Sequence, residues 1–167
     1  MPAPGARIQA ARRPSVNHAS LNVKMSRKRS RARRCVVQAL YQWQVGGTDP
    51  AEVDLAFLSE DPAGVDQAYF RELLAQIKAH ADELDRLLAP LVDRPLPEVD
   101  PVERAVLWLG ACELAYRMEI PFRVVINEGV ELAKSFGAEQ GHKFVNGILD
   151  RLAARLRPHE IEALRKT

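Results

Sequence analysis

Residues 102–118 read VERAVLWLGACELAYRM, and apolar side chains fall on almost every side of the helix that this segment predicts. Such a helix needs other helices around it, so we expect it to form the buried centre of the C-terminal half. Asp100 and Pro101 precede it as a cap and a first-turn proline, and Glu103 stands at the spacing of a capping box. No stretch of the chain alternates as a strand does, and the predicted fold class is all-α.

Helical periodicity continues on both sides of this segment. Toward the C-terminus it predicts helices at about 123–137 and 139–156, and Pro158 allows one short helix after them. Toward the N-terminus, apolar residues recur at helical spacing over 66–88. This run is longer than an average helix, so a bend or break is expected near residues 79–82.

Two further helices are predicted nearer the N-terminus. One covers residues 30–45 and stops at a pair of glycines. The other starts at Asp49 and Pro50, carries Phe57 on its apolar face and ends before residue 61. The total is about seven helices.

Prolines suggest how these helices are grouped. Residues 94–97, Arg-Pro-Leu-Pro, would link an N-terminal helical sub-bundle (26–93) to a C-terminal one (98–167). Residues 1–25 have no sustained periodicity and are predicted to be a disordered basic extension. They resemble an organellar targeting peptide only weakly, and an upstream start before a compact protein that begins at Met25 is the simpler explanation.

Charge is distributed unevenly along the chain. Residues 1–48 contain ten Lys or Arg and no Asp or Glu, whereas the rest of the chain carries 14 basic and 22 acidic side chains. A cationic arm on an anionic body is typical of a protein that grips a polyanion with one end. An unpartnered basic tail is the alternative that charge alone leaves open.

Several functional classes lack their signals in this sequence. The histidines stand at no metal-ligand spacing, and no Gly-rich phosphate loop, nucleophile motif or paired-carboxylate motif is present. Glu113 and Glu128 are expected on solvated helix faces. Cys35 and Cys112 lie in apolar contexts and are expected to be buried free thiols. No apolar run has the length of a membrane span. We therefore expect no enzyme, cofactor, metal or membrane contact.

The helix predicted over residues 30–45 has two contrasting faces when its residues are placed at 100° intervals. One face carries an apolar stripe made of Val36, Ala39, Leu40 and Trp43. The opposite face, with the helix extended back to residue 27, aligns Arg27, Arg31, Arg34, Gln38 and Tyr41. Arginine forks match phosphate geometry, a tyrosine ring can stack on an unpaired base, and a glutamine amide can bond a base edge.

This alignment favours RNA binding over the plainer alternative, in which the arginines only solubilise the helix and Tyr41 packs at its edge. The pattern does not exclude DNA. However, no helix-turn-helix pattern with a polar recognition helix is present, and a stacking residue beside basic groups suits single-stranded RNA better.

The residues now permit a comparison with a known family. Residues 31–44 (RARRCVVQALYQWQ), 125–134 (VINEGVELAK) and 135–150 (SFGAEQGHKFVNGILD) resemble the NusB family of transcription antitermination factors. The resemblance covers about residues 27–158. It implies a protein of two helical sub-bundles that binds boxA-type single-stranded RNA in ribosomal RNA leaders together with NusE, a small-subunit ribosomal protein. It further implies loading onto RNA polymerase with other Nus factors, and a cytoplasmic location.

The resemblance also implies roles for particular residues. The RNA-contacting set would comprise Arg27, Lys28, Arg29, Arg31, Arg33, Arg34, Gln38 and Tyr41, with Lys143 as a further phosphate contact. Glu103 and Arg104 would lie on the surface for NusE, although a glutamate at position 103 has a capping role as well. Whether the free protein forms homodimers is left open by the family.

Two alternatives belong to other classes. A similar helical domain forms the front end of certain ribosomal RNA cytosine methyltransferases, and this sequence carries neither their Gly-rich motif nor their catalytic cysteine motif. The other alternative is a purely structural helical interaction protein.

Overall fold

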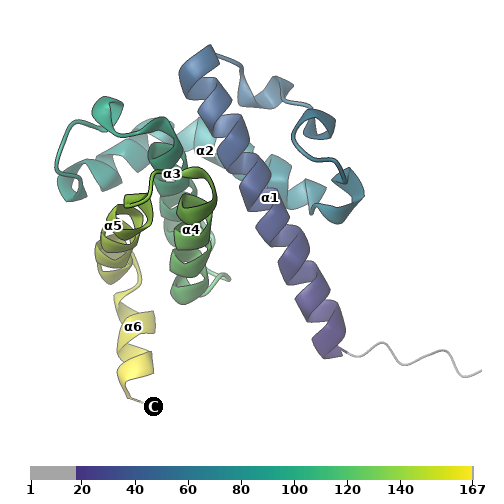
Figure 1. Ribbon diagram of the computed structural model, residues 1–167. Coiled ribbons are helices and arrows are strands. Elements are labelled where there is room, and N and C mark those ends of the chain that lie inside the picture. Colours follow the sequence, from purple (N-terminus) through teal and green to yellow (C-terminus); the bar gives the residue numbers. More distant parts are fainter. Residues whose placement is uncertain (1–17, 167) are drawn as a thin grey trace, which may run out of the picture.

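The computed structural model describes residues 18–166, and this part of the chain forms six α-helices and no strand (Figure 1). The helices are α1 His18–Gly46, α2 Gln67–Leu88, α3 Pro101–Tyr116, α4 Phe122–Phe136, α5 Gly141–Leu156 and α6 Pro158–Arg165. The all-α prediction is confirmed. The number of helices is one lower than the expected seven because the segment after Asp49 forms separate turns instead of a helix.

Helix α3 lies at the centre of the molecule and packs against α1, α2, α4 and α5. Val106, Leu107 and Leu114 are fully buried along it. The predicted buried helix is thus confirmed, and it serves both halves of the chain. One continuous apolar cluster extends from α1 to α5. The predicted linker contains a 3-10 turn, Leu96–Glu98. The buried apolar residues before and after this turn belong to one cluster.

Helix α1 begins at His18, much earlier than predicted, and its first turns project away from the other helices (Figure 1). The expectation of disorder up to residue 25 is therefore wrong for residues 18–25, while residues 1–17 lie outside the described part. No proline or glycine interrupts positions 18–45, and Leu, Lys, Met and Arg there are good helix formers. The sequence predicted a later start for this helix because its first turns are exposed. A helix segment with no packed face shows no periodic apolar pattern.

The helix predicted after Asp49 is wrong. The chain instead makes three 3-10 turns, Pro50–Glu52, Leu55–Phe57 and Pro62–Gly64. The Asp49 carboxylate accepts a hydrogen bond from Ala51 N at 2.9 Å, and the Asp54 carboxylate accepts one from Ala56 N at 3.0 Å. Short side chains that bond their own backbone compete with a continuous helix and restart the turn at each aspartate.

Helix α2 is bent where the sequence indicated. His80 has non-helical backbone angles (φ −116°, ψ 17°), which confirms the predicted break near residues 79–82. Its imidazole stacks on the Tyr116 ring with centroids 4.6 Å apart. Helix α2 packs against α3, and the His80–Tyr116 contact joins the bend to the last residue of α3.

Both cysteines are buried and free, as predicted. Over residues 18–166, no helix is long and apolar enough to cross a membrane. Within the same range, His, Cys, Asp and Glu side chains form no group of three that could hold a metal ion.

Candidate nucleic-acid interface

The packed face of α1 is the one that the sequence predicted. Val36, Ala39 and Leu40 are fully buried. Trp43 is half-buried and packs against Trp108, with ring centroids 5.5 Å apart. This stripe fixes which side of α1 is left to face outward.

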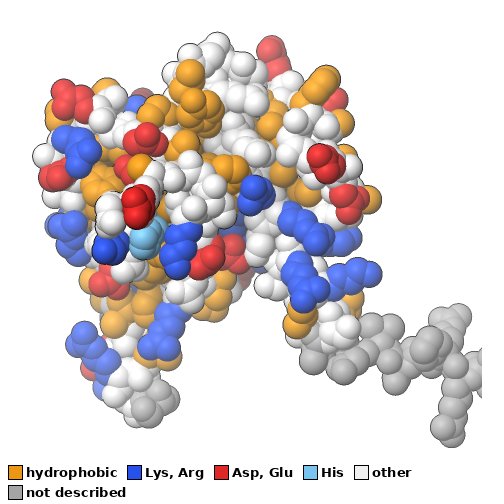
Figure 2. Space-filling view, viewed as in Figure 1, with side chains coloured by type: hydrophobic (Ala, Val, Ile, Leu, Met, Phe, Trp, Pro, Cys, Tyr) orange, Lys and Arg blue, Asp and Glu red, His pale blue; other side chains and the backbone are white. Residues whose placement is uncertain are grey.

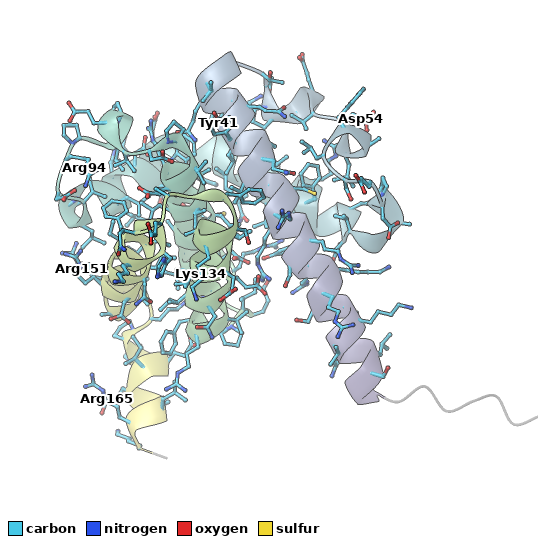
Figure 3. All side chains as sticks on the ribbon, in the orientation of Figure 1. Tyr41, Asp54, Arg94, Lys134, Arg151 and Arg165 are labelled. Carbon is cyan, nitrogen blue, oxygen red and sulfur yellow. The ribbon has the colours of Figure 1, made fainter. Side chains whose placement is uncertain are left out.

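The outward side of α1 carries the predicted basic and aromatic groups. Arg27, Arg31, Arg34 and Tyr41 are exposed, and Gln38 is half-buried between them. Lys and Arg side chains gather over the lower half of α1 in the space-filling view (Figure 2), and Tyr41 stands further along the same helix (Figure 3). The predicted alignment of this face is thus present in the folded chain.

Three adjoining hollows form a groove along this face, here called the α1 groove. On the α1 wall, the first hollow is lined by Lys24, Arg27, Lys28 and Arg31, the second by Arg31, Arg34 and Gln38, and the third by Gln38 and Tyr41. Residues 57–65 form most of the facing wall. Arg31 lines both the first and the second hollow, and Gln38 and Leu58 line both the second and the third. The groove is therefore continuous from the basic end of α1 to Tyr41.

Arg31 and Arg34 of the groove are held in place by contacts other than ion pairs. Arg31 Nη1 donates a hydrogen bond to the Gly64 carbonyl oxygen at 3.2 Å, and the Arg34 guanidinium carbon lies 4.5 Å from the centre of the Phe136 ring. Within residues 18–166 neither arginine forms an ion pair with a carboxylate. The facing wall carries the acids Glu60 and Asp61. Because these repel a polyanion, it would be drawn to the basic α1 wall.

Arg33 does not belong to this surface, and the prediction that it contacts RNA is wrong. Only 3% of it is exposed, and its Nε donates to both carboxylate oxygens of Glu113 at 3.1 and 3.0 Å. Position 33 falls on the packed side of α1, one turn before Val36 and Val37. The prediction that Glu113 is solvated is wrong for the same reason, since it is 1% exposed.

Arg33 and Glu113 are the centre of a buried polar cluster that joins four helices. The Tyr69 hydroxyl donates to Glu113, Arg33 Nη1 lies 3.4 Å from Glu128 Oε1, and Ser30 Oγ donates to that same oxygen at 2.6 Å. Burial by itself would lower the pKa of Arg33, but the carboxylates of Glu113 and Glu128 raise it above its usual value. The guanidinium thus stays charged, and the cluster anchors α1 to α2, α3 and α4.

Two other basic residues of the predicted set have intermediate positions. Arg29 lies 3.8 Å from the Asp66 carboxylate, and its guanidinium carbon is 4.7 Å from the centre of the Tyr69 ring. It therefore faces α2 and not the groove. Lys28 is half-buried and lines the basic end of the groove beside Asp61.

Comparison with known proteins bears on what this groove does. The model of the NusB family matches residues 30–154. The chain belongs to the NusB family. The transcription antitermination protein NusB of Nitrosococcus oceani is 53% identical over 139 residues, which cover 83% of this chain and 94% of that protein. The NusB of Shewanella amazonensis is 57% identical over 129 residues, covering 77% of this chain and 96% of that protein.

Solved NusB structures share the fold. T. maritima NusB superposes with a TM-score of 0.63 at 32% identity, covering 80% of this chain and 96% of that one. A chain from the complex of antitermination factors NusB and NusE with double-stranded RNA has a TM-score of 0.65 at 26% identity, covering 75% and 96%. NusB membership confirms the family resemblance and the prediction of a non-enzymatic protein.

The two residues expected on the NusE surface of a NusB protein lie at the start of α3, and both are engaged within the chain. Glu103 is 8% exposed and its carboxylate lies against Gly141. Asp100 caps the helix by accepting from Val102 N at 2.9 Å and from Glu103 N at 3.3 Å, but the Glu103 side chain returns no hydrogen bond to it. Burial, followed by the Asp100 charge, raises the pKa of Glu103. Arg104 pairs with Asp85 at 3.1 Å and lies over the Trp108 ring.

At the start of α5, Lys143 is exposed and forms no ion pair within residues 18–166, so its side chain is free to meet an anion. Phe144 beside it is half-buried and packs on the core. The residue that sequence reasoning missed is Phe57, which lies at the rim of the α1 groove and is 89% exposed. The available signal was the repetition of aspartates at positions 49, 54 and 61, which indicates successive turns and not one helix.

Proposed function

We propose that this chain is a transcription antitermination factor that binds boxA-type single-stranded RNA of ribosomal RNA leaders together with NusE. Through that complex it would join RNA polymerase and other Nus factors in the cytoplasm. The observation that carries the proposal is the α1 groove, in which Arg31 and Arg34 are held in place without a carboxylate partner.

The chemistry of the groove supports RNA and favours its single-stranded form. Phosphates would lie on Arg31 and Arg34, whose planar forks donate paired hydrogen bonds. The exposed ring of Tyr41 offers a stacking surface that only an unpaired base can use. The solved relative is a complex of NusB and NusE with double-stranded RNA, so a duplex is the natural competitor to include in a test.

Support for the protein partner comes from that same solved relative, in which NusB and NusE occur in one complex. The start of α3 is the proposed contact, with Glu103 and Arg104 at its centre. Both side chains are largely buried in the free chain, so binding there would use their small exposed edges or a local rearrangement. Lys143 is proposed as an RNA contact outside the groove.

The deciding experiment is a titration of the full chain with a boxA-like RNA, a scrambled RNA of the same composition and a duplex of the boxA-like strand. Each titration is run at several salt concentrations with and without NusE. We expect preference for the boxA-like single strand, increased when NusE is present. Equal affinity for all three RNAs in the presence of NusE would refute the proposal. Sedimentation of the free protein at the same concentrations measures any homodimer that would compete with binding.

The methyltransferase alternative receives no comparable support. The relatives described above are named as antitermination proteins, and the matched regions extend over 94% and 96% of their lengths.

A further inference from the structure

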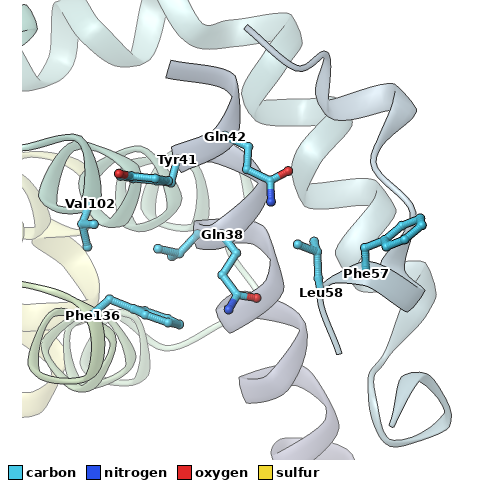
Figure 4. Close-up of a pocket in the computed structure, with 8 residues that line it drawn as sticks. Gln38, Tyr41, Gln42, Phe57, Leu58, Val102 and Phe136 are labelled. Atoms are coloured by element: carbon cyan, nitrogen blue, oxygen red, sulfur yellow. The ribbon is translucent and has the colours of Figure 1, made fainter. Parts of the chain in front are cut away.

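The third hollow of the α1 groove differs from the other two because its walls are aromatic and apolar. It encloses about 530 Å³, within the range of sites that hold small organic groups. Gln38 and Gln42 lie between Tyr41 and Phe136 on one side and Leu58 and Phe57 on the other (Figure 4). No Lys or Arg lines it. A phosphate would therefore find no cationic partner here, whereas a flat apolar ring would find apolar walls.

Phe57 is the most exposed large apolar side chain in the described part of the chain. Its backbone is nevertheless well held, since Phe57 N donates to the Asp54 carbonyl at 3.1 Å. Leu55 on one side is buried, and Leu58 on the other packs against the core. A rigid turn thus presents a phenyl ring to solvent at the rim of the hollow. Exposed aromatic rings fixed in this way are typical of binding surfaces.

Gln38 supplies a polar group that lacks a partner. Its Oε1 atom is buried and accepts no hydrogen bond from residues 18–166. Buried polar atoms are nearly always satisfied, so the Gln38 amide gains a hydrogen bond when its side chain turns toward an N–H donor in the hollow. The exocyclic amines and ring N–H groups of nucleobases are such donors.

The hollow is also the direct continuation of the phosphate-binding part of the groove. Gln38 and Leu58 line both, and Arg34 lies over the Phe136 ring that closes the hollow. An RNA strand with phosphates on Arg31 and Arg34 would bring a base to this position. A protein segment would gain nothing from the adjoining arginines unless it were acidic.

We infer that this hollow receives one unpaired base of the bound RNA, which rests on the proposed function. The base stacks on the Phe57 ring, and the Gln38 amide bonds its polar edge. Phe57 is then an RNA-contacting residue contributed by the turn Leu55–Phe57, and not by the basic helix. In this arrangement the arginines position the strand while the hollow selects the base.

The test compares Phe57→Ala with Met118→Ala, since Met118 is 62% exposed and lines none of the three hollows. We expect Phe57→Ala to weaken RNA binding about tenfold, the size of a lost base–aromatic stack. The slope of log affinity against log salt should not change, because no charge is removed. Gln38→Leu should instead reduce the preference for the boxA-like RNA over the scrambled one.

A second readout locates the base. A single 2-aminopurine is placed at successive positions of the RNA, and its fluorescence is followed on binding. One position should be strongly quenched by the wild-type chain and recover with Phe57→Ala. The inference is overturned if Phe57→Ala binds RNA as Met118→Ala does and no position is selectively quenched. It is equally overturned if Phe57→Ala loses only NusE. If the wild-type chain shows no preference for the boxA-like RNA, the proposed function fails. The comparison of Phe57→Ala with Met118→Ala still tests whether the third hollow contacts RNA.

Discussion

The Arg33 guanidinium and the Glu113 carboxylate, 80 positions apart in the chain, are joined in the core by two hydrogen bonds of 3.1 and 3.0 Å. The pair connects the helix that carries the groove to the central helix α3. Because Arg31 and Arg34 flank Arg33 on the same helix, this buried pair helps to fix the direction in which the exposed arginines point. Adjacent arginines of one basic run thus have opposite roles.

Replacement of Arg33 should therefore destabilise the fold. Arg33→Met leaves the Glu113 carboxylate buried without its cation, which typically costs about 3–5 kcal/mol of unfolding free energy. Urea denaturation followed by circular dichroism measures the change. The double variant Arg33→Met/Glu113→Leu should lose less than the sum of the single changes, since no lone buried charge remains. Arg34→Met is the matched control and should change stability by less than about 0.5 kcal/mol; equal losses at positions 33 and 34 would contradict the assignment.

The exposed arginines should show the reverse behaviour. Arg31→Gln and Arg34→Gln each remove one phosphate contact, so each should weaken binding to all RNAs to a similar extent. The slope of log affinity against log salt should fall by about 0.7 for each, the value for a single strand. Arg165→Gln, on α6 and away from the groove (Figure 3), is the control that should leave the slope unchanged. A salt slope that responds equally to all three changes would indicate binding without a defined site.

Local periodicity predicted the groove only in part. The 100° geometry placed Arg31, Arg34 and Tyr41 correctly because the opposite stripe is strongly apolar and defines the packed side. The same geometry left Arg33 off this face, and only the family resemblance added it to the RNA-contacting set. Its buried pairing could not be predicted from periodicity, because its partner Glu113 lies on another helix. Phe57 was missed because capping signals of a helix and of a short turn coincide in the sequence.

The two cysteines should be unreactive in the native chain. Burial raises the pKa of Cys112 to about 12 and also raises the pKa of Cys35. A raised thiol pKa means less thiolate, the species that attacks thiol reagents, at any given pH. At pH 8 we expect almost no reaction with a chromogenic disulfide reagent in buffer and reaction of two thiols in denaturant. Fast native labelling of the single-cysteine variant Cys112→Ala would show that Cys35 opens locally.

Arg157, at the junction of α5 and α6, should be the most important single side chain for holding the end of α3. It is 3% exposed and donates to four carbonyl oxygens. These belong to Glu113, Leu114, Arg117 and Ile120, at distances of 2.9 to 3.1 Å. The Glu160 carboxylate, 2.6 Å from Nη1, balances its charge. The last carbonyls of a helix have no partner within the helix, so this guanidinium satisfies the end of α3 from outside.

Arg157→Lys should therefore fail to replace arginine, because three ammonium donors cannot reach the acceptors that the planar fork reaches. We expect both Arg157→Lys and Arg157→Met to lower the unfolding free energy by about 2–4 kcal/mol, the range for losing several buried hydrogen bonds. For a chain of this size this lowers Tm by roughly 5–15 °C. The exposed Arg155→Met is the matched control on the same helix. If Arg157→Lys melted at the wild-type temperature, a point charge beside Glu160 would be sufficient, and the carbonyl contacts would contribute little.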